Sequence, residues 1–409
     1  MATDMFAAGR FRTRGQRAAL DAVIAMLATG MPHAVLLVGP PGVGKGTLAE
    51  DIAAGLLCRA PDGPRPCREC RGCRALEHGN HPDVHRLEPV GAGSVIPIGG
   101  REERGVRDLV RDLALLPVEG GARVAIVSAA DRMTEDAQSA FLKTLEEPPA
   151  ATVLILTAAD EERLLETIRS RVVRIRLGPV GRPDVEQILV DADAADAPLA
   201  ARLARLSAGR PGDAMALARV PEALTIRAEI GRTLLDLAVA TRADRLRLGR
   251  DLLARAGELA AAIRRGTGAS EPASSTQRRP ARGRKGAVER PAPAAAPAAQ
   301  VSGDADTEAP APEAAGPASR VPPAERRAAA LTLVAIWRDV ARDLAVVAFG
   351  EPGSVRQLDL LDDLEASTAR LPASFAAAQL RRLEVAGERL EGNVSPELVV
   401  DALALGWAA

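Results

Sequence analysis

The sequence of 409 residues contains no tyrosine, and aromatic side chains make up only 2% of it. Alanine, arginine, glycine and proline are abundant instead, and we attribute this bias to a GC-rich genome, so it says nothing about chemistry. No run of 18 or more apolar residues occurs, and Met1–Arg14 has no apolar core before a small-residue cleavage site. These absences predict a cytoplasmic protein without a membrane segment.

The formal net charge is −1, which argues against a generally basic nucleic-acid binder but does not exclude local basic patches. Apolar residues make up 47% and charged residues 26%, as in an ordinary soluble protein. A chain of this length has room for two or three domains, each with its own core.

Cysteine is scarce and clustered: Cys58, Cys67, Cys70 and Cys73 are the four in the chain. The spacing C-x8-C-x2-C-x2-C predicts a tetrahedral zinc site better than a disulfide framework. Four thiolates leave no open position, so the Zn²⁺ should be structural. The alternative is a set of reduced, unrelated cysteines. His78, His81 and His85 follow closely, but we expect surface or capping roles for them.

A glycine-rich loop follows the apolar run at residues 34–38. It matches G-x-x-x-x-G-K from Gly39 through Gly44 to Lys45, and Gly42 lies within it, so backbone N–H groups and a lysine are available for a phosphate. A P-loop places Ser or Thr next, to complete the Mg²⁺ shell. Here Gly46 stands in that position and Thr47 comes one residue late.

Apolar periodicity predicts a helix over residues 15–29 before the loop, and helical spacing resumes after it. Four further apolar runs are typical of buried parallel strands: Val84–Leu87, Val124–Val127, Val153–Thr157 and Val172–Leu177. Strands alternating with helices behind a P-loop predict a doubly wound α/β domain over residues 1–178.

Only helical patterns follow. We expect a small helical lid over residues 179–220 and a helical domain over 221–409. Residues from about 266 to 323 are rich in Ala, Pro, Gly, Ser and charge, which predicts a disordered insertion within that second helical domain.

A P-loop ATPase also needs an acidic strand end, Asp for Mg²⁺ and then Glu for the attacking water. The strand Val124–Val127 is followed instead by Ser128 and Ala129, with Asp131 too far along, where we expect it to cap a helix. All recognisable metal-handling groups are therefore missing, and we expect no hydrolysis by this chain alone.

Several motifs together resemble the bacterial DNA polymerase III clamp-loader subunits, a family of the AAA+ class. They are the P-loop with its four-cysteine insertion, the run from Asp131 to Pro149, and L-L-E-T-I-R-S-R-V from Leu164 to Val172. The end of the chain, Leu390 to Leu405, is similar to the delta-prime members in particular. The resemblance implies an AAA+ type α/β domain, a lid and a collar for hetero-oligomerisation.

The resemblance also implies residue roles. Ser170 and Arg171 match the family's S-R-C motif, although Val172 replaces the cysteine. In delta-prime-like subunits this arginine serves as a finger in a neighbour's ATP site, and on spacing alone it would be only part of a solvated strand face. Thr157 resembles a nucleotide-sensing position, or it only caps a helix. Gly212 stands where ATPase members have an arginine.

The function implied is that of a non-hydrolysing delta-prime-like subunit, part of the DNA polymerase III holoenzyme, a nucleotidyltransferase. Its partners would be gamma/tau and delta subunits and, through the complex, the sliding clamp and primer-template DNA. One alternative is a gamma/tau-like ATPase, and another is a sensor that binds ATP through Lys45 without hydrolysing it. A nucleoside or nucleotide kinase is a more remote reading of the loop.

Overall fold

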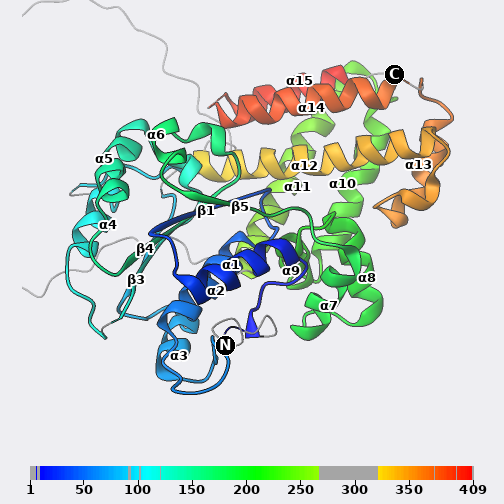
Figure 1. Ribbon diagram of the computed structural model, residues 1–409. Coiled ribbons are helices and arrows are strands. Elements are labelled where there is room, and N and C mark those ends of the chain that lie inside the picture. The colour runs from blue at the N-terminus through cyan, green and yellow to red at the C-terminus, as the bar shows by residue number, and fades with distance from the viewer. Residues whose placement is uncertain are drawn as a thin grey trace, which may run out of the picture.

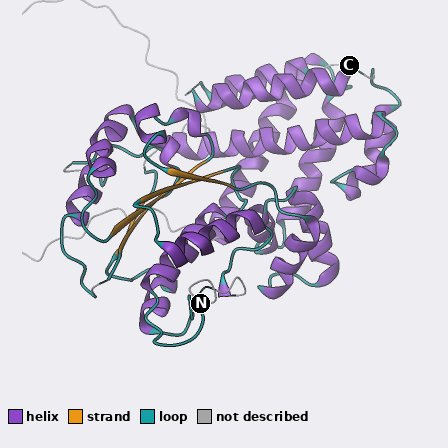
Figure 2. Cartoon of the chain, viewed as in Figure 1, coloured by secondary structure: helices purple, strands orange, loops and turns teal. Residues whose placement is uncertain are grey.

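The computed structural model describes residues 6, 10–90, 94–100, 103–119, 121–266, 321–372, 374–392 and 394–407. An α/β part comes first in the chain and is followed by helices only (Figure 1; Figure 2). None of the helices in these ranges combines the length and the apolar character that crossing a membrane requires.

Five parallel strands form one sheet with the order β2-β3-β4-β1-β5. They are β1 (Ala34–Val38), β2 (Val84–Leu87), β3 (Arg123–Val127), β4 (Thr152–Ala158) and β5 (Val173–Arg176). Every strand predicted from an apolar run is present. The three central strands are almost entirely buried, as expected for a parallel sheet covered on both faces.

Helices cover both faces of this sheet. Alternate residues of β1 belong to different cores: Val35 and Leu37 pack with α1 (Arg17–Thr29) and α2 (Lys45–Leu57), and Leu36 packs on the other side. That second side is covered by α4 (Val106–Leu113), α5 (Glu135–Glu146) and α6 (Glu166–Arg169), while α3 (Arg71–Glu77) follows α2. The predicted doubly wound α/β fold is confirmed.

The remaining helices form one buried apolar cluster. They are α7 (Arg182–Asp191), α8 (Ala197–Ser207), α9 (Pro211–Ala218), α10 (Ala223–Leu237), α11 (Arg242–Gly266), α12 (Pro323–Ala348), α13 (Leu361–Thr368), α14 (Phe375–Glu391) and α15 (Pro396–Gly406). The predicted insertion at 266–323 lies almost wholly outside the described residues, and α11 and α12 on its two sides pack against each other. The limits of the lid and the second helical domain remain predictions.

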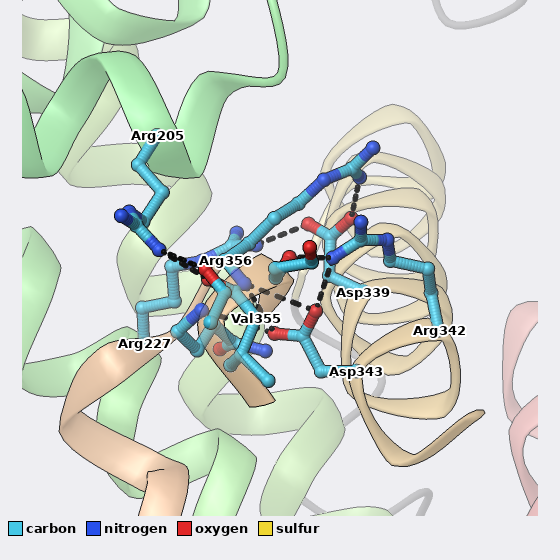
Figure 3. Close-up of polar contacts among 10 residues, drawn as sticks. Arg205, Arg227, Asp339, Arg342, Asp343, Val355 and Arg356 are labelled. Carbon is cyan, nitrogen blue, oxygen red and sulfur yellow. Dashed lines mark hydrogen bonds and ion pairs between the residues drawn. The ribbon is translucent and has the colours of Figure 1, made fainter. Parts of the chain in front are cut away.

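Polar contacts join α8 of the lid region to the helices after it (Figure 3). The guanidinium of Arg205 donates to the backbone oxygens of Gly353 and Val355, at 3.0 Å each. Arg227 of α10 pairs with Asp339 of α12, whose other carboxylate oxygen lies 3.1 Å from Arg356. These contacts fix α8 to the loop after α12, and α10 to α12 itself.

Candidate nucleotide cleft, metal cluster and arginine

The glycine-rich loop connects β1 to the first turn of α2, as the motif predicts. Gly44 occupies the N-cap position with φ 102°, a conformation that a side chain would disfavour. The Nζ of Lys45 donates to the backbone oxygens of Gly39 and Pro40, so the lysine lies folded over the loop. Burial lowers the pKa of Lys45, and the nearby carboxylate of Asp131 opposes that shift. A phosphate at this helix N-terminus would meet backbone N–H groups and a lysine.

The loop forms the floor of a cleft of about 470 Å³, within the usual size of small-molecule sites. Its walls come from the segment before α1, the carboxyl ends of β3 and β4, and the lid. They consist of Arg12, Thr13, Arg14, the loop residues Gly42 to Thr47, Ser128, Thr157, Ile188, Pro211, Gly212 and Met215. The predicted loop residues and Thr157 are thus brought together, apart from Gly39, which lies at the start of the loop.

Gly212 closes the lid side of the cleft. Its N–H donates to the backbone oxygen of Gly42 at 2.9 Å. A Cβ atom added at Gly212 would lie 3.1 Å from the Cα of Gly42, which is tighter than ordinary van der Waals contact. An arginine at this position would therefore need a shift of the lid, and glycine permits the lid to rest on the loop.

The strand end beside the loop carries no acid. Ser128, which follows β3, donates its N–H to the oxygen of Leu87, and the N–H of Ala129 donates to Thr157 Oγ1 at 3.0 Å. Thr157 is buried, and this contact ties the ends of β3 and β4 together. The prediction that Asp131 caps a helix is wrong. Its Oδ2 instead accepts N–H groups of the turn after β4, from residues 159 and 160 at 3.2 and 3.3 Å.

Thr134 is the residue that caps the helix after β3, since its side-chain oxygen accepts the N–H of Ala137 at 3.2 Å. The sequence signal for this cap was available in the Thr-Glu-Asp run, where two acids follow the cap in the first turn. Asp131 was also a plausible cap in the sequence, because aspartate is among the residues preferred at the N-cap position of a helix.

The four cysteines lie together. All four Sγ atoms are within 4.8 Å of one another, and those of Cys67 and Cys73 are 3.9 Å apart. A tetrahedron with Zn–S bonds of about 2.3 Å has S···S edges of about 3.8 Å, so the donor set fits zinc. Among the described residues, the groups able to hold a metal consist of these four thiols.

Local N–H groups point at the sulfur atoms. Cys67 Sγ accepts the N–H of Cys70 at 3.2 Å, and Cys70 Sγ accepts that of Cys73 at 3.4 Å. Burial raises the pKa of Cys67, but N–H donors from Glu69 and Cys70 outweigh it and lower that pKa to about 6. Burial raises the pKa of the Cys58 and Cys73 thiols, and coordination would supply the free energy to deprotonate them.

Arg171 lies apart from the cleft, in the turn between α6 and β5. Its guanidinium donates to Glu146 at 2.6 Å, to the backbone oxygen of Thr167 at 3.0 Å and to Ser170 Oγ at 3.3 Å. The side chain is 36% exposed. The two predicted residues Ser170 and Arg171 therefore contact each other, and Glu146, the last residue of α5, pairs with the arginine.

Sequence reasoning missed the segment before α1, residues 10–16, which we call the strap. Arg12, Thr13 and Arg14 line the cleft. Gln16 Nε2 donates to the loop oxygen of Val43 at 3.3 Å and to that of Gly178 at 2.6 Å. The signal was the alternation R-F-R-T-R just ahead of the first predicted helix, with basic residues on either side of the buried Phe11.

Taken together, the sheet order, the loop after β1 and the cleft define an α/β protein with a P-loop-like phosphate-binding loop. Residues 15–181 match the family model described as "DNA polymerase III, delta subunit". Over 142 residues the chain is 44% identical to DNA polymerase III subunit delta' of Pseudomonas aeruginosa, covering 35% of this chain and 42% of that protein. Over 190 residues it is 40% identical to the delta' subunit of Escherichia coli, covering 45% and 54%.

The chain thus spans about half the length of these curated relatives. It is also 31% identical over 209 residues to DNA polymerase III subunit tau of Escherichia coli, covering 50% of this chain and 31% of that protein. Residues 15–181 thus resemble that family model, and the similarity of the chain is to proteins named DNA polymerase III subunit delta'.

Proposed function

We propose that this chain is a non-hydrolysing, delta-prime-like subunit of a DNA polymerase III clamp loader that supplies Arg171 to the ATP site of a neighbouring ATPase subunit. The observation that carries the proposal is the position of Arg171 relative to the chain's own cleft. The arginine and the P-loop lie at opposite ends of two neighbouring parallel strands, β5 and β1.

The register makes this separation explicit. β1 and β5 are parallel, with Val35 beside Val173 and Val38 beside Arg176. The P-loop follows the carboxyl end of β1, whereas Arg171 precedes the amino end of β5. Five residues of strand separate the two levels, or about 16 Å at 3.3 Å per residue. Arg171 therefore cannot serve its own P-loop and is available only to another molecule.

The chemistry of an arginine finger suits this exposed side chain. A guanidinium is always charged and offers a planar fork of donors to a transferring phosphoryl group. Its present acceptor, Glu146, is half exposed, so the pair is screened and contributes about 0–1 kcal/mol. A neighbour's γ-phosphate can displace such a partner at little cost.

The cleft itself supports the non-hydrolysing part of the proposal. Gly46, Ser128 and Ala129 stand where Mg²⁺ and the attacking water would be handled, and Asp131 is bonded to the turn after β4. A gamma/tau-like ATPase would need a hydroxyl at position 46 and carboxylates at the end of β3. The tau relative supports a complex that also contains gamma/tau-type subunits, with the sliding clamp and primed DNA reached through that complex.

The test is Arg171→Ala in a complex reconstituted with the ATPase and delta subunits. Removal of a trans arginine finger lowers the rate at the served site by about 10³ to 10⁵. We expect the complex still to assemble. Its ATP turnover in the presence of clamp and primed DNA should fall by the fraction of the total turnover that the one affected site contributes. Arg174→Ala is the matched control, because Arg174 lies on β5 and pairs with Glu161 within the chain. Equal turnover in both variants and wild type contradicts the assignment.

A second candidate function is nucleotide binding without turnover by this chain itself. It is favoured by the cleft, which combines the N-terminus of α2, Lys45 and the strap arginines Arg12 and Arg14. ATP or ADP bound there would contact residues of α9, which line the cleft. Nucleotide binding would therefore depend on the position of α9 relative to the sheet.

A further inference from the structure

The four-cysteine cluster and the cleft are joined by one buried carboxylate, that of Asp51. We propose that Arg68, in the turn between two zinc ligands, acts with Asp51 as a pair of positioning residues that hold the strap against α2, so that metal binding orders the wall of the nucleotide cleft. The consequence for nucleotide affinity rests on the second candidate function, whereas the anchoring of the strap does not.

Asp51 lies on α2, almost two turns after Lys45, and is fully buried. One carboxylate oxygen accepts the backbone N–H of Arg12 at 3.0 Å and the guanidinium of Arg68. The other accepts both the N–H and the hydroxyl of Thr13, at 2.8 and 2.7 Å. A buried carboxylate requires a charged partner and hydrogen-bond donors for its oxygens. Here Arg68, in the loop between Cys67 and Cys70 (the zinc loop), supplies the charge, and the strap supplies the N–H donors.

Arg68 is held in place by its position between ligands. It follows Cys67 and precedes Cys70 by two residues, and its φ of 65° is in the left-handed region, which costs of order 1 kcal/mol for a residue other than glycine. Coordination of Cys67 and Cys70 to one metal closes this turn and fixes that conformation. The fixed turn also lets Arg68 Nε donate to the backbone oxygen of Arg10 at 3.1 Å.

The strap then passes from the zinc loop to the cleft. Arg10 donates back to the oxygen of Cys67 at 3.4 Å, and Arg12 pairs with Glu77 of α3. Phe11 is buried in the core beneath α2. The far end is held by Gln16, whose amide reaches the loop oxygen of Val43 and that of Gly178 just after β5. Loss of the Arg68 contact therefore frees the cleft-lining residues at one end only.

The experiment measures hydrogen exchange of the strap amides in the full chain, loaded with zinc and verified at one zinc per chain by elemental analysis. The N–H groups of Arg12 and Thr13 are the reporters, because both donate to Asp51. We expect at least a tenfold faster exchange in Arg68→Ala with zinc retained, and a similar change in wild type after removal of the metal with a chelator. Arg68→Lys, which restores the charge, should recover part of the protection.

Arg71→Ala is the matched control. Arg71 is in the same zinc module, but its side chain is 90% exposed and lies 3.5 Å from Glu119, away from the strap. We expect its exchange rates to equal those of wild type. Unchanged strap exchange in both Arg68→Ala and the metal-free wild type overturns the proposal, as does an Arg71→Ala effect as large as that of Arg68→Ala.

A second measurement addresses the cleft. ADP binding, followed with a fluorescent analogue, should weaken at least threefold when zinc is removed. By linkage, ADP should raise the affinity of the chain for zinc by the same factor, so a chelator should remove the metal less readily when ADP is bound. If zinc-loaded wild type binds no ADP, the second candidate function fails, and the exchange experiment alone decides whether the zinc loop anchors the strap. If ADP binds equally with and without zinc, the coupling is wrong while nucleotide binding stands.

Discussion

Asp343 offers a quantitative test of how the lid is attached to the helices after it. This carboxylate on α12 is fully buried. One oxygen accepts Arg342 at 2.7 Å and the N–H of Arg356 at 3.1 Å, and the other accepts the N–H of Gln357 at 3.0 Å. It thereby shapes the loop whose oxygens at Gly353 and Val355 receive Arg205 from the lid (Figure 3).

The substitution Asp343→Asn keeps the size of the side chain and replaces one acceptor with an NH₂ donor. Either the loop N–H groups or the Arg342 guanidinium then face a donor, and one hydrogen bond to a charged group is lost. Such a bond contributes about 1.5–3 kcal/mol, so we expect the free energy of unfolding to fall by about 2 kcal/mol. Asp343→Ala, which removes both acceptors, should cost about 3–5 kcal/mol.

Tryptophan fluorescence during urea unfolding measures this change in the helical part alone. The chain has two tryptophans and no tyrosine. Trp337 and Trp407 are both buried and pack edge to face with centroids 5.3 Å apart. With a slope of about 2 kcal/mol per molar urea, a loss of about 2 kcal/mol lowers the midpoint by about 1 M.

The control is Asp363→Asn, because Asp363 is half exposed and lies 3.3 Å from the half-exposed Arg232. An exposed pair of this kind contributes less than about 1 kcal/mol, so its midpoint should hardly move. Equal midpoints for Asp343→Asn and Asp363→Asn would refute the reasoning that the buried carboxylate organises the loop.

Two further predictions concern the α/β part. Lys45→Ala should weaken ATP binding by about 100-fold with an unchanged melting temperature, because Lys45 bonds only to loop oxygens; titration with a fluorescent nucleotide measures this, and equal affinity contradicts a phosphate site. Burial lowers the pKa of His85, although Asp112 opposes the shift. The unfolded chain then binds the proton of His85 more tightly than the folded chain does. The stability that the neutral, buried His85 contributes is therefore fully present above about pH 6.5 and is lost as the pH falls below it. His85→Gln should reduce that acid loss in thermal unfolding followed by circular dichroism, and identical pH profiles would contradict this.

Much of the fold could be predicted because its strands are buried on both faces. Parallel strands covered by helices become continuous apolar runs, and Val35, Leu36 and Leu37 satisfy two different cores at once. The cysteine cluster was equally predictable, since chelation at short spacing is a local property of the chain. Asp131 failed as a prediction because its partners are N–H groups 28 and 29 residues away, and no local pattern encodes them.

The parts of the site that the sequence could not supply are the contacts between elements far apart in the chain. Asp51 appears in the sequence as one more polar residue on an amphipathic helix, yet it is fully buried and receives donors from the strap and from the zinc loop. Likewise Glu146 ends a helix and also holds Arg171, 25 residues further on. Each acid is paired with an arginine of another segment, Asp51 with Arg68 and Glu146 with Arg171. Arg68 therefore joins the cysteine insertion to the P-loop helix, and Arg171 joins the turn before β5 to α5. Substituting each arginine in turn would separate its two proposed roles, the ordering of the cleft wall by Arg68 and the contribution of Arg171 to the ATP site of a neighbouring subunit.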